Sequence, residues 1–347
     1  MKIYWLFLFL FFVSPFMNAQ VGIDTLRLSG YLAQIEEKGQ VMGSLDIMKD
    51  GKSIYSCCLG KDIISQGQAI DAPLYRIGSI SKMFTAVLIY QQVEKGKLKL
   101  DDKLSDYFPE VPRAGEITIY QLLEHSAGLG NYIMKNDSSY TWMLSEVSHA
   151  EIMKEIIRQG ILYDPGKGFK YSNSGYYLLA RILVKIAKKP YPEIVEESIT
   201  RPLELYQTYS GLIEATDIAI PYQMDEAGEW IEVPDFYFPN VMGVGELVST
   251  PGDINCFLHA LFSGKLISSE HLQQIMKPFG TDRHGRGMMY LPYNKHNFYG
   301  HTGDTFGVHS IGAFNEQDGI SIAVNMNGGT IPFADFLQGV FKSIYKE

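Results

Sequence analysis

Ser79 and Lys82 lie three positions apart in the stretch RIGSISKMFTA. Positions i and i+3 share one face of a helix, so the two side chains can touch if this stretch is helical. The residues that follow are almost wholly apolar, which predicts a buried helix over 79–94. Burial and the positive end of the helix dipole both favour the neutral amine of Lys82, which can then take the hydroxyl proton of Ser79. The spacing therefore predicts a nucleophilic serine that carries its own base.

The same spacing occurs again near the end of the chain, in Ser343 and Lys346, and no chemistry is assigned to that second pair. Two fixed residues are weak support on their own, and two further motifs strengthen the interpretation. The first is Tyr171-Ser172-Asn173, which precedes an apolar stretch. A tyrosine there can relay a proton beside the lysine, and an asparagine amide both donates and accepts hydrogen bonds. The alternative for this tripeptide is helix capping, because serine and asparagine are favourable N-cap residues.

The second motif is His301-Thr302-Gly303, at the start of a predicted pair of strands near the C-terminus. Glycine lets a substrate lie close to the backbone of a strand. Histidine and threonine supply hydrogen-bond donors for a carboxylate or a carbonyl group. The alternative is a loop histidine without a partner.

Two hairpins and several helices must bring these motifs together. Strand-like runs surround Asp50-Gly51 in the stretch 43–60, and the stretch 307–326 repeats this pattern near the other end of the chain. Between and after them, helical periodicity predicts helices over 79–94, 118–124, 149–159, 176–187, 253–263 and 332–346.

The economical assembly of these elements is an α/β plus α fold. The hairpins from both chain ends share one antiparallel sheet, which the first and last helices flank, and a helical lobe is inserted between them. The sheet lobe then comprises about residues 20–78 and 265–347, and the helical lobe about 79–264. An active site is expected in the cleft between the two lobes.

The composition is that of an ordinary globular chain with an acidic balance. The 347 residues carry a formal net charge of −9. A negative chain without a basic stripe is a poor candidate for binding nucleic acid, so we expect none as a partner. Cys57, Cys58 and Cys256 are not the even, spaced set of a disulfide framework, and they are predicted to be buried free thiols.

Residues 1–19 have the layout of a secretory signal peptide. Lys2 precedes the apolar run YWLFLFLFFV, and Ala19 offers a small residue for cleavage before Gln20. The alternative is a single membrane anchor, for which the apolar run is short. We therefore expect a mature domain over 20–347, in the periplasm or secreted, without a stable membrane anchor.

In this order, the motifs at Ser79, Tyr171 and His301 resemble those of the penicillin-recognising serine hydrolases. The nearest resemblance is to the class C β-lactamases and the serine D-alanyl-D-alanine carboxypeptidases. The Tyr-Ser-Asn and His-Thr-Gly forms found here are those of the carboxypeptidase side. Further stretches similar to this family are KGKLKLDDKLSDYFPE (95–110), ITIYQLLEHSAGL (117–129), RPLEL (201–205), LVSTPGDINCFLHAL (247–261) and GHTGDTFGVHS (300–310). The resemblance covers most of residues 30–345.

The resemblance implies a role for each catalytic residue. Ser79 attacks a carbonyl group and forms an acyl-enzyme. Lys82 and Tyr171 share the proton transfers of acylation, and Tyr171 with Lys82 activates the water of deacylation. Asn173 orients Lys82 and the amide carbonyl of the substrate.

It also implies a substrate-binding wall opposite the serine. His301, Thr302 and Gly303 line the far side and hold a substrate carboxylate. The backbone N–H groups of Ser79 and Asp304 form the oxyanion hole. The resemblance implies no metal and no organic cofactor.

Two acidic residues depart from the family pattern, and two arginines are candidates for binding a substrate carboxylate. Asp304 stands where the family usually has a small residue or threonine, and its charge, if turned inward, would repel a substrate carboxylate. Glu246 stands where a glycine is common and adds a second negative charge nearby. Arg283 and Arg286 could bind a carboxylate, although solvation at the surface is the favoured interpretation of both.

The function expected from these residues is hydrolysis of D-amino-acid peptides through a Ser79 acyl-enzyme, as in a D-alanyl-D-alanine carboxypeptidase. Hydrolysis of β-lactam rings, hydrolysis of small esters and a catalytically silent binding or sensor module are the alternatives. An α/β-hydrolase would need a Gly-x-Ser-x-Gly motif, which no serine here provides. His296, His301, Asp304 and His309 are close in sequence but lack a metalloprotease pattern, so no metal site is expected.

Overall fold

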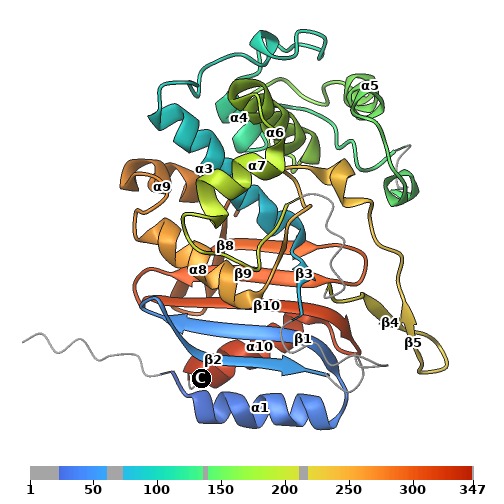
Figure 1. The fold of residues 1–347 in the computed structure, drawn as a ribbon, viewed down its shortest axis with the longest axis vertical. Helices are drawn as coiled ribbons and strands as arrows, with labels where there is room; N and C mark the ends of the chain where they lie inside the picture. Colours follow the sequence, from blue (N-terminus) through green and yellow to red (C-terminus); the bar gives the residue numbers. More distant parts are fainter. Residues whose placement is uncertain (1–22, 61–72, 136–139, 211–217, 346–347) are drawn as a thin grey trace, which may run out of the picture.

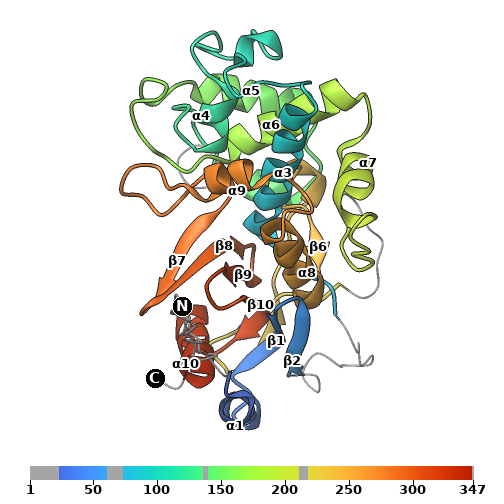
Figure 2. The same ribbon diagram turned by 90° about the vertical axis from the view of Figure 1, so that its left-hand side faces the viewer.

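The computed structural model describes residues 23–60, 73–135, 140–210 and 218–345. Its largest sheet has six antiparallel strands in the order β2-β1-β10-β9-β8-β7, all of which are labelled in Figure 2, and Figure 1 shows the same sheet from another side. The strands are β1 (Val41–Lys49), β2 (Lys52–Leu59), β7 (Met289–Tyr293), β8 (His296–Asp304), β9 (His309–Asn315) and β10 (Ile320–Gly329). Ile47 of β1 pairs with Ile322 of β10, so the prediction that both chain ends share one sheet is confirmed.

The N-terminal hairpin has the turn that its sequence predicts. Asp50 and Gly51 link β1 to β2 with φ angles of 48° and 78°. A two-residue turn with positive φ at both positions matches the right-handed twist of the strands it joins.

Helices cover both faces of the sheet. Helix α10 (Phe333–Tyr345) packs on one face, as predicted for the last helix. Helix α1 (Thr25–Glu37), which the sequence analysis did not predict, packs beside it on the same face. Helix α8 (Pro251–Phe262) packs on the other face, against β1, β9 and β10 (Figure 2). The glycine at position 312 permits this approach, since a Cβ atom there would lie 2.5 Å from Ile254.

The helical lobe is built around α3 (Ser81–Glu94), which is buried along most of its length. The other helices of this lobe are α4 (Ile119–Leu123), α5 (His149–Gln159), α6 (Asn173–Ala187), α7 (Tyr191–Val195) and α9 (Ser269–Met276). The remaining elements are the strands β3 (Tyr75–Arg76), β4 (Tyr222–Met224), β5 (Trp230–Glu232) and β6 (Val248–Ser249), the 3₁₀ turns η1 (Gly78–Ile80), η2 (Leu104–Asp106), η3 (Thr141–Leu144) and η5 (Phe238–Val241), and the π-helical turn η4 (Glu196–Thr200).

Two predicted boundaries need correction. The stretch that begins at Ser79 starts as the 3₁₀ turn η1 and becomes α-helical at Ser81. Helix α6 begins at Asn173 instead of residue 176, because Ser172 has extended backbone geometry and serves as its N-cap.

The cysteines are free, as predicted, but less buried than predicted. Cys57 and Cys58 on β2 are half-buried, and Cys256 is exposed. Cys256 lies on α8 between the buried Asn255 and Phe257, so its side chain faces away from the sheet.

The described residues contain no helix that is long and apolar enough to span a membrane. The predicted signal peptide, residues 1–19, lies outside the described part of the chain.

Candidate active site

Ser79 sits where the turn η1 crosses the end of strand β8. Two glycines make this close approach possible. A Cβ atom on Gly303 would lie 1.9 Å from the carbonyl oxygen of Ile77, and one on Gly78 would lie 3.0 Å from the backbone nitrogen of Asp304. Gly78 also has a φ of 51°, which favours glycine. The turn and the strand thus bring the backbone of Ser79 next to that of Asp304, as the expected oxyanion hole requires.

The three expected catalytic side chains meet at one atom. The Oγ atom of Ser79 lies 2.8 Å from Nζ of Lys82, and the hydroxyl of Tyr171 donates a hydrogen bond of 2.8 Å to the same Oγ. Nζ of Lys82 also donates to the carbonyl oxygen of Val244, at 2.9 Å. Lys82, from the first turn of α3, and Tyr171, from the segment just before α6, therefore both reach the hydroxyl of Ser79.

Lys82 is placed where an ammonium ion is unfavourable. Its side chain is fully buried, and this burial holds the pKa of the amine well below its usual range. The carboxylate of Glu246 opposes the shift only in part. A neutral amine beside a serine hydroxyl has a lone pair that can accept the hydroxyl proton.

Tyr171 lies among three imidazole rings. The ring centroids of His125, His284 and His301 are 4.4, 5.3 and 6.3 Å from that of Tyr171. Burial raises the pKa of the Tyr171 phenol, and the hydrogen bond to Ser79 opposes this rise. Tyr171 is therefore a protonated donor at neutral pH.

His125 supports Tyr171, and the sequence reasoning did not single it out. Burial lowers the pKa of His125 well below its usual value, so the ring is neutral. Its Nδ1 accepts a hydrogen bond of 3.2 Å from the backbone nitrogen of Ser172. The signal for it is the stretch ITIYQLLEHSAGL, residues 117–129, whose resemblance to the family includes this histidine.

Asn173 has a different neighbour from the one expected. Its Nδ2 donates to Oδ1 of Asn131 at 3.1 Å, while the hydrogen bonds of Lys82 go to Ser79 and Val244. Within the described residues, the buried Oδ1 of Asn173 has no hydrogen-bond partner. Asn173 lines the cavity in front of Ser79, so this oxygen can accept a hydrogen bond from a substrate amide.

A cavity of about 290 Å³ opens in front of Ser79. Its wall is largely apolar and aromatic. It is lined by Gly78, Ser79, Asn131, Ile133, Met134, Tyr140, Asn173, Phe236, Phe238, Val241, Val244, Gly245, Asp304, Thr305 and Phe306. The ring of Phe306 lies 4.5 Å from that of Phe236 and 5.3 Å from that of Tyr140, so three separate segments contribute to one aromatic wall.

Sequence reasoning missed this wall. The signal for it was the stretch DFYFPN, residues 235–240, which is rich in aromatic residues but has no helical or strand period. Large apolar side chains in an irregular segment are candidates for a binding surface.

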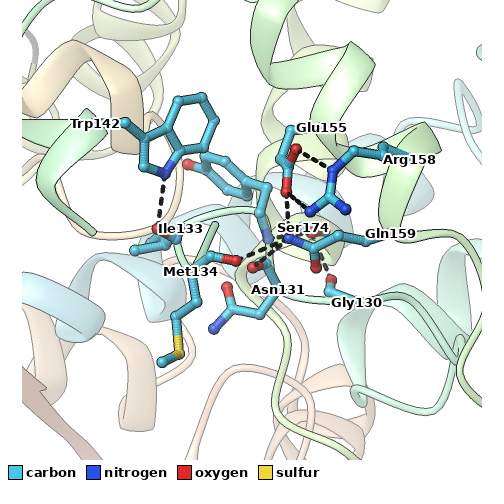
Figure 3. A network of polar contacts seen from close by, with 10 residues as sticks. Gly130, Asn131, Ile133, Met134, Trp142, Glu155, Arg158, Gln159 and Ser174 are labelled. Atoms are coloured by element: carbon cyan, nitrogen blue, oxygen red, sulfur yellow. Dashed lines mark hydrogen bonds and ion pairs between the residues drawn. The ribbon is translucent and has the colours of Figure 1, made fainter. Parts of the chain in front are cut away.

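One side of the cavity is held by a polar network (Figure 3). Nε2 of Gln159 donates to the carbonyl oxygens of Asn131 and Met134 at 3.1 and 2.9 Å. The same Nε2 donates to the buried carboxylate of Glu155, which also accepts from Arg158. Nε1 of Trp142 donates to the carbonyl oxygen of Ile133 at 2.9 Å. Helix α5 thereby fixes the backbone that carries Asn131, Ile133 and Met134.

The charge of the cavity is set by Asp304. No lysine or arginine is among its described lining residues. The carboxylate of Asp304 is exposed and accepts a hydrogen bond of 2.7 Å from Nδ1 of His309, so it lies at the mouth of the cavity.

His301 and Thr302 are not among the lining residues, in contrast to the expected carboxylate site. His301 is buried on β8, where its Nδ1 contacts the carbonyl oxygen of Thr302. Burial and the nearby Lys82 lower the pKa of His301 to about 3, so the ring carries no charge at neutral pH. The hydroxyl of Thr302 faces Sδ of Met289 at 3.8 Å.

The two arginines differ in environment. Arg283 is exposed, as expected. The expectation of surface solvation is wrong for Arg286, which is buried and forms an ion pair of 2.9 Å with Glu124. Arg286 also donates to the carbonyl oxygen of Gln274, so its charge is committed to the helical lobe.

Comparisons with known proteins agree with this architecture. A family model described as Beta-lactamase matches residues 31–338. PbpX of Bacillus subtilis (strain 168), whose name assigns it to the penicillin-binding proteins, is 28% identical over 280 residues, or 78% of this chain and 67% of PbpX. The teichoic acid D-alanine hydrolase of Staphylococcus aureus (strain NCTC 8325 / PS 47) is 26% identical over 295 residues, or 82% of this chain and 70% of that protein.

Among solved structures, the D-amino acid amidase of Ochrobactrum anthropi SV3, complexed with L-phenylalanine amide, is similar with a TM-score of 0.78 and 25% identity. The match covers 92% of this chain and 97% of the amidase. The fold, the convergence on Ser79 and a family match over most of its length make this chain a member of the Beta-lactamase family.

Proposed function

We propose that the protein is an exported serine hydrolase that acts on D-amino-acid amides and peptides through an acyl-enzyme on Ser79. One observation carries the proposal: the amine of Lys82 and the hydroxyl of Tyr171 both lie 2.8 Å from Oγ of Ser79, which lines the cavity. A serine in contact with an adjacent base is the arrangement that activates a hydroxyl for nucleophilic attack.

Acylation uses these groups in sequence. The neutral amine of Lys82 takes the hydroxyl proton while Ser79 Oγ bonds to the substrate carbonyl carbon. The backbone N–H groups of Ser79 and Asp304 stabilise the oxyanion. The phenol of Tyr171 protonates the leaving nitrogen as the C–N bond breaks, and the proton held by Lys82 restores the phenol.

Deacylation reverses the proton path. A water molecule gives its proton through Tyr171 to Lys82 and adds to the ester carbon. The proton then returns to Ser79 Oγ as the ester bond breaks and the acid leaves. The next cycle begins with the same neutral lysine.

The D-configuration is supported by the relatives. A teichoic acid D-alanine hydrolase and a D-amino acid amidase are both similar to this chain over most of its length. The feature that these two names share is a D-amino acid, and we propose that this protein recognises a D-amino acid without proposing that it acts on the complete substrate of either relative.

The cavity favours a particular kind of D-amino-acid substrate. A wall that includes Phe236, Phe306 and Tyr140 suits a large apolar side chain. Asp304 at the mouth suits a free ammonium group and repels a carboxylate. Hydrolysis of D-amino-acid amides is therefore better supported than the carboxypeptidase and β-lactamase activities expected from the sequence, because the substrates of those two activities carry carboxylates.

Turnover of a matched set of compounds tests this proposal. The set comprises D-phenylalanine amide, L-phenylalanine amide, N-acetyl-D-phenylalanine amide, a peptide ending in D-Ala-D-Ala, benzylpenicillin and p-nitrophenyl butyrate. Ser79→Ala is the inactive control. We expect the D-amide with a free amine to have the highest kcat/KM, by about tenfold over its N-acetyl form. Preference for the D-Ala-D-Ala peptide or for the butyrate ester would contradict the proposed substrate and favour a carboxypeptidase or an esterase.

Export rests on the predicted signal peptide. Expression of the full chain with N-terminal sequencing of the mature protein tests it, with Gln20 as the expected first residue. A mature protein that retains residues 1–19 would contradict cleavage.

A further inference from the structure

The turn formed by residues 243–246 docks on the face of α3 that carries the catalytic base. Nζ of Lys82 donates to the carbonyl oxygen of Val244 at 2.9 Å. About one helical turn later, Oγ1 of Thr85 donates to the carbonyl oxygen of Gly243 at 2.8 Å. The position of the amine therefore depends on where this turn holds its two carbonyl groups.

Glu246 closes that turn with its side chain. Its Oε2 accepts a hydrogen bond of 2.8 Å from the backbone nitrogen of Gly243, and its Oε1 accepts one of 3.1 Å from Oγ of Ser210. Gly243 has a φ of 73°, and a Cβ atom there would lie 2.3 Å from Cβ of Ala180. The turn is thus pressed between α3 and α6, and the carboxylate spans it from end to end.

The burial of this carboxylate needs a reason. Glu246 is only 1% exposed, and a buried carboxylate is unfavourable unless donors and charges compensate it. Lys82 on α3, Tyr191 on α7 and Tyr132 are the titratable groups whose pKa values its charge raises. Burial raises the pKa of Glu246 itself to about 7, so its charge changes near neutral pH.

We propose that Glu246 is a positioning residue for Lys82, which holds the Val244 carbonyl against the amine and keeps the amine within reach of Ser79. This inference rests on the proposed Ser79 mechanism. It goes beyond it by assigning a function to a buried acid that is not itself among the residues lining the cavity and whose side-chain hydrogen bonds go to Gly243 and Ser210.

The test measures activation of Ser79 without assuming a substrate. A fluorophosphonate reagent labels activated serines, and intact mass reports the rate of labelling at each pH. The variants are Glu246→Gln, which keeps one oxygen acceptor for Gly243, and Glu246→Ala, which keeps none. Asp46→Asn is the matched control, because Asp46 is also buried but accepts its hydrogen bonds from Ser53 and Asn255, far from the site.

We expect Glu246→Ala to lower the labelling rate by about tenfold to a hundredfold. Glu246→Gln should stay within about threefold of the unchanged protein, because the amide oxygen can still accept from Gly243. The rate of labelling should fall on the acid side of its pH profile, where Lys82 becomes protonated, and this fall is the acid limb. The amide removes the negative charge that favours the ammonium form of Lys82, so the acid limb of the Gln variant should move to lower pH. Asp46→Asn should leave the rate and the limb unchanged.

Each other outcome has a defined meaning. Equal labelling of the unchanged protein and a folded Glu246→Ala variant would overturn the inference and leave the Ser79 mechanism standing. If Glu246→Ala does not fold, Glu246→Asp takes its place, because its shorter side chain withdraws the carboxylate from Gly243, and labelling equal to that of the unchanged protein overturns the inference. Absence of labelling in the unchanged protein would overturn both, whereas rapid labelling without amide turnover would remove only the proposed substrate.

Discussion

The imidazole of His125 lies against the phenol of Tyr171, with ring centroids 4.4 Å apart and planes inclined by 32°. The contact involves the faces of the rings and leaves the hydroxyl of Tyr171 directed at Ser79. The ring atoms of Tyr171 provide its packing, whereas its hydroxyl provides the hydrogen bond to Ser79. A substitution that removes only the hydroxyl can therefore test the chemistry without changing the packing.

Tyr171→Phe should remove activity without unfolding the protein. Phenylalanine keeps the ring against His125, while the donor to Ser79 Oγ is lost. We expect kcat to fall by about a hundredfold to ten-thousandfold, as for loss of a general acid. Thermal unfolding of the variant should resemble that of the unchanged protein. Retention of more than a tenth of kcat would argue against proton transfer by Tyr171.

Ser79→Ala should abolish turnover, and Ser343→Ala should leave it unchanged. The second serine has the same spacing to a lysine in the sequence, but its Oγ donates to the carbonyl oxygen of Gly339 within α10. Steady-state rates and intact mass of both variants after reaction with substrate check this. Activity that survives loss of Ser79 would exclude the proposed nucleophile.

Lys82→Met should stabilise the fold while removing activity. The pKa of Lys82 is lowered on folding, so the unfolded chain binds more protons at this position than the native chain. Stability in the unchanged protein therefore rises with pH, from the lowered pKa up to the ordinary value. Methionine binds no proton, so the stability of the variant lacks this pH dependence. The free energy of unfolding of Lys82→Met should therefore exceed that of the unchanged protein most at low pH, and the difference should shrink as pH rises. Urea unfolding at several pH values measures this, and a gap that grows with pH would show that Lys82 is charged in the native state.

Asp304→Asn should change substrate preference with little effect on stability. The side chain is exposed, so the free energy of unfolding should change by less than about 0.5 kcal/mol. Loss of the charge should lower kcat/KM for an amide with a free ammonium group by about threefold to tenfold. The rate with a carboxylate-bearing peptide should rise. Glu316→Gln, an exposed acid at the opposite end of β9, is the control and should alter neither rate.

Gly303→Ala should disrupt the site through the backbone. Its Cβ would lie 1.9 Å from the carbonyl oxygen of Ile77, so β8 and the turn before Ser79 must move apart. We expect a loss of about 3 kcal/mol in stability and a large loss of kcat. Gly30→Ala on α1 is the matched control, because nothing lies within 4 Å of a Cβ there. That control should be neutral or slightly stabilising, and a mild Gly303→Ala phenotype would contradict the close packing described for the site.

The sequence was informative wherever chemistry depends on local spacing. Ser79 and Lys82 touch because they are one helical turn apart, and the Asp50-Gly51 hairpin forms because those two residues tolerate positive φ. Both inferences required only the backbone geometry of single elements. The pairing of the two terminal hairpins was expected as the economical assembly of the predicted strands and helices.

The remainder depended on contacts between distant segments. The neutrality of His301 comes from burial by surrounding elements, and the ion pair of Arg286 needs Glu124 from the distant end of α4. Glu246 was noticed as an unusual charge, but its hydrogen bonds to Gly243 and Ser210 are created by a turn and a loop that no periodicity predicts. Burial and long-range partners decide the charge state of such groups, and neither is encoded in local spacing.

The pairing of β1 with β10 also sets the order of events during synthesis. Ile47 leaves the ribosome long before its partner Ile322. The central strand pair therefore cannot form until β10 has been made, and β8, whose Asp304 is expected to complete the oxyanion hole, is also made long after Ser79. A nascent chain that has not reached β8 lacks this side of the site, so the surroundings of Ser79 are completed only by a contact between distant parts of the chain.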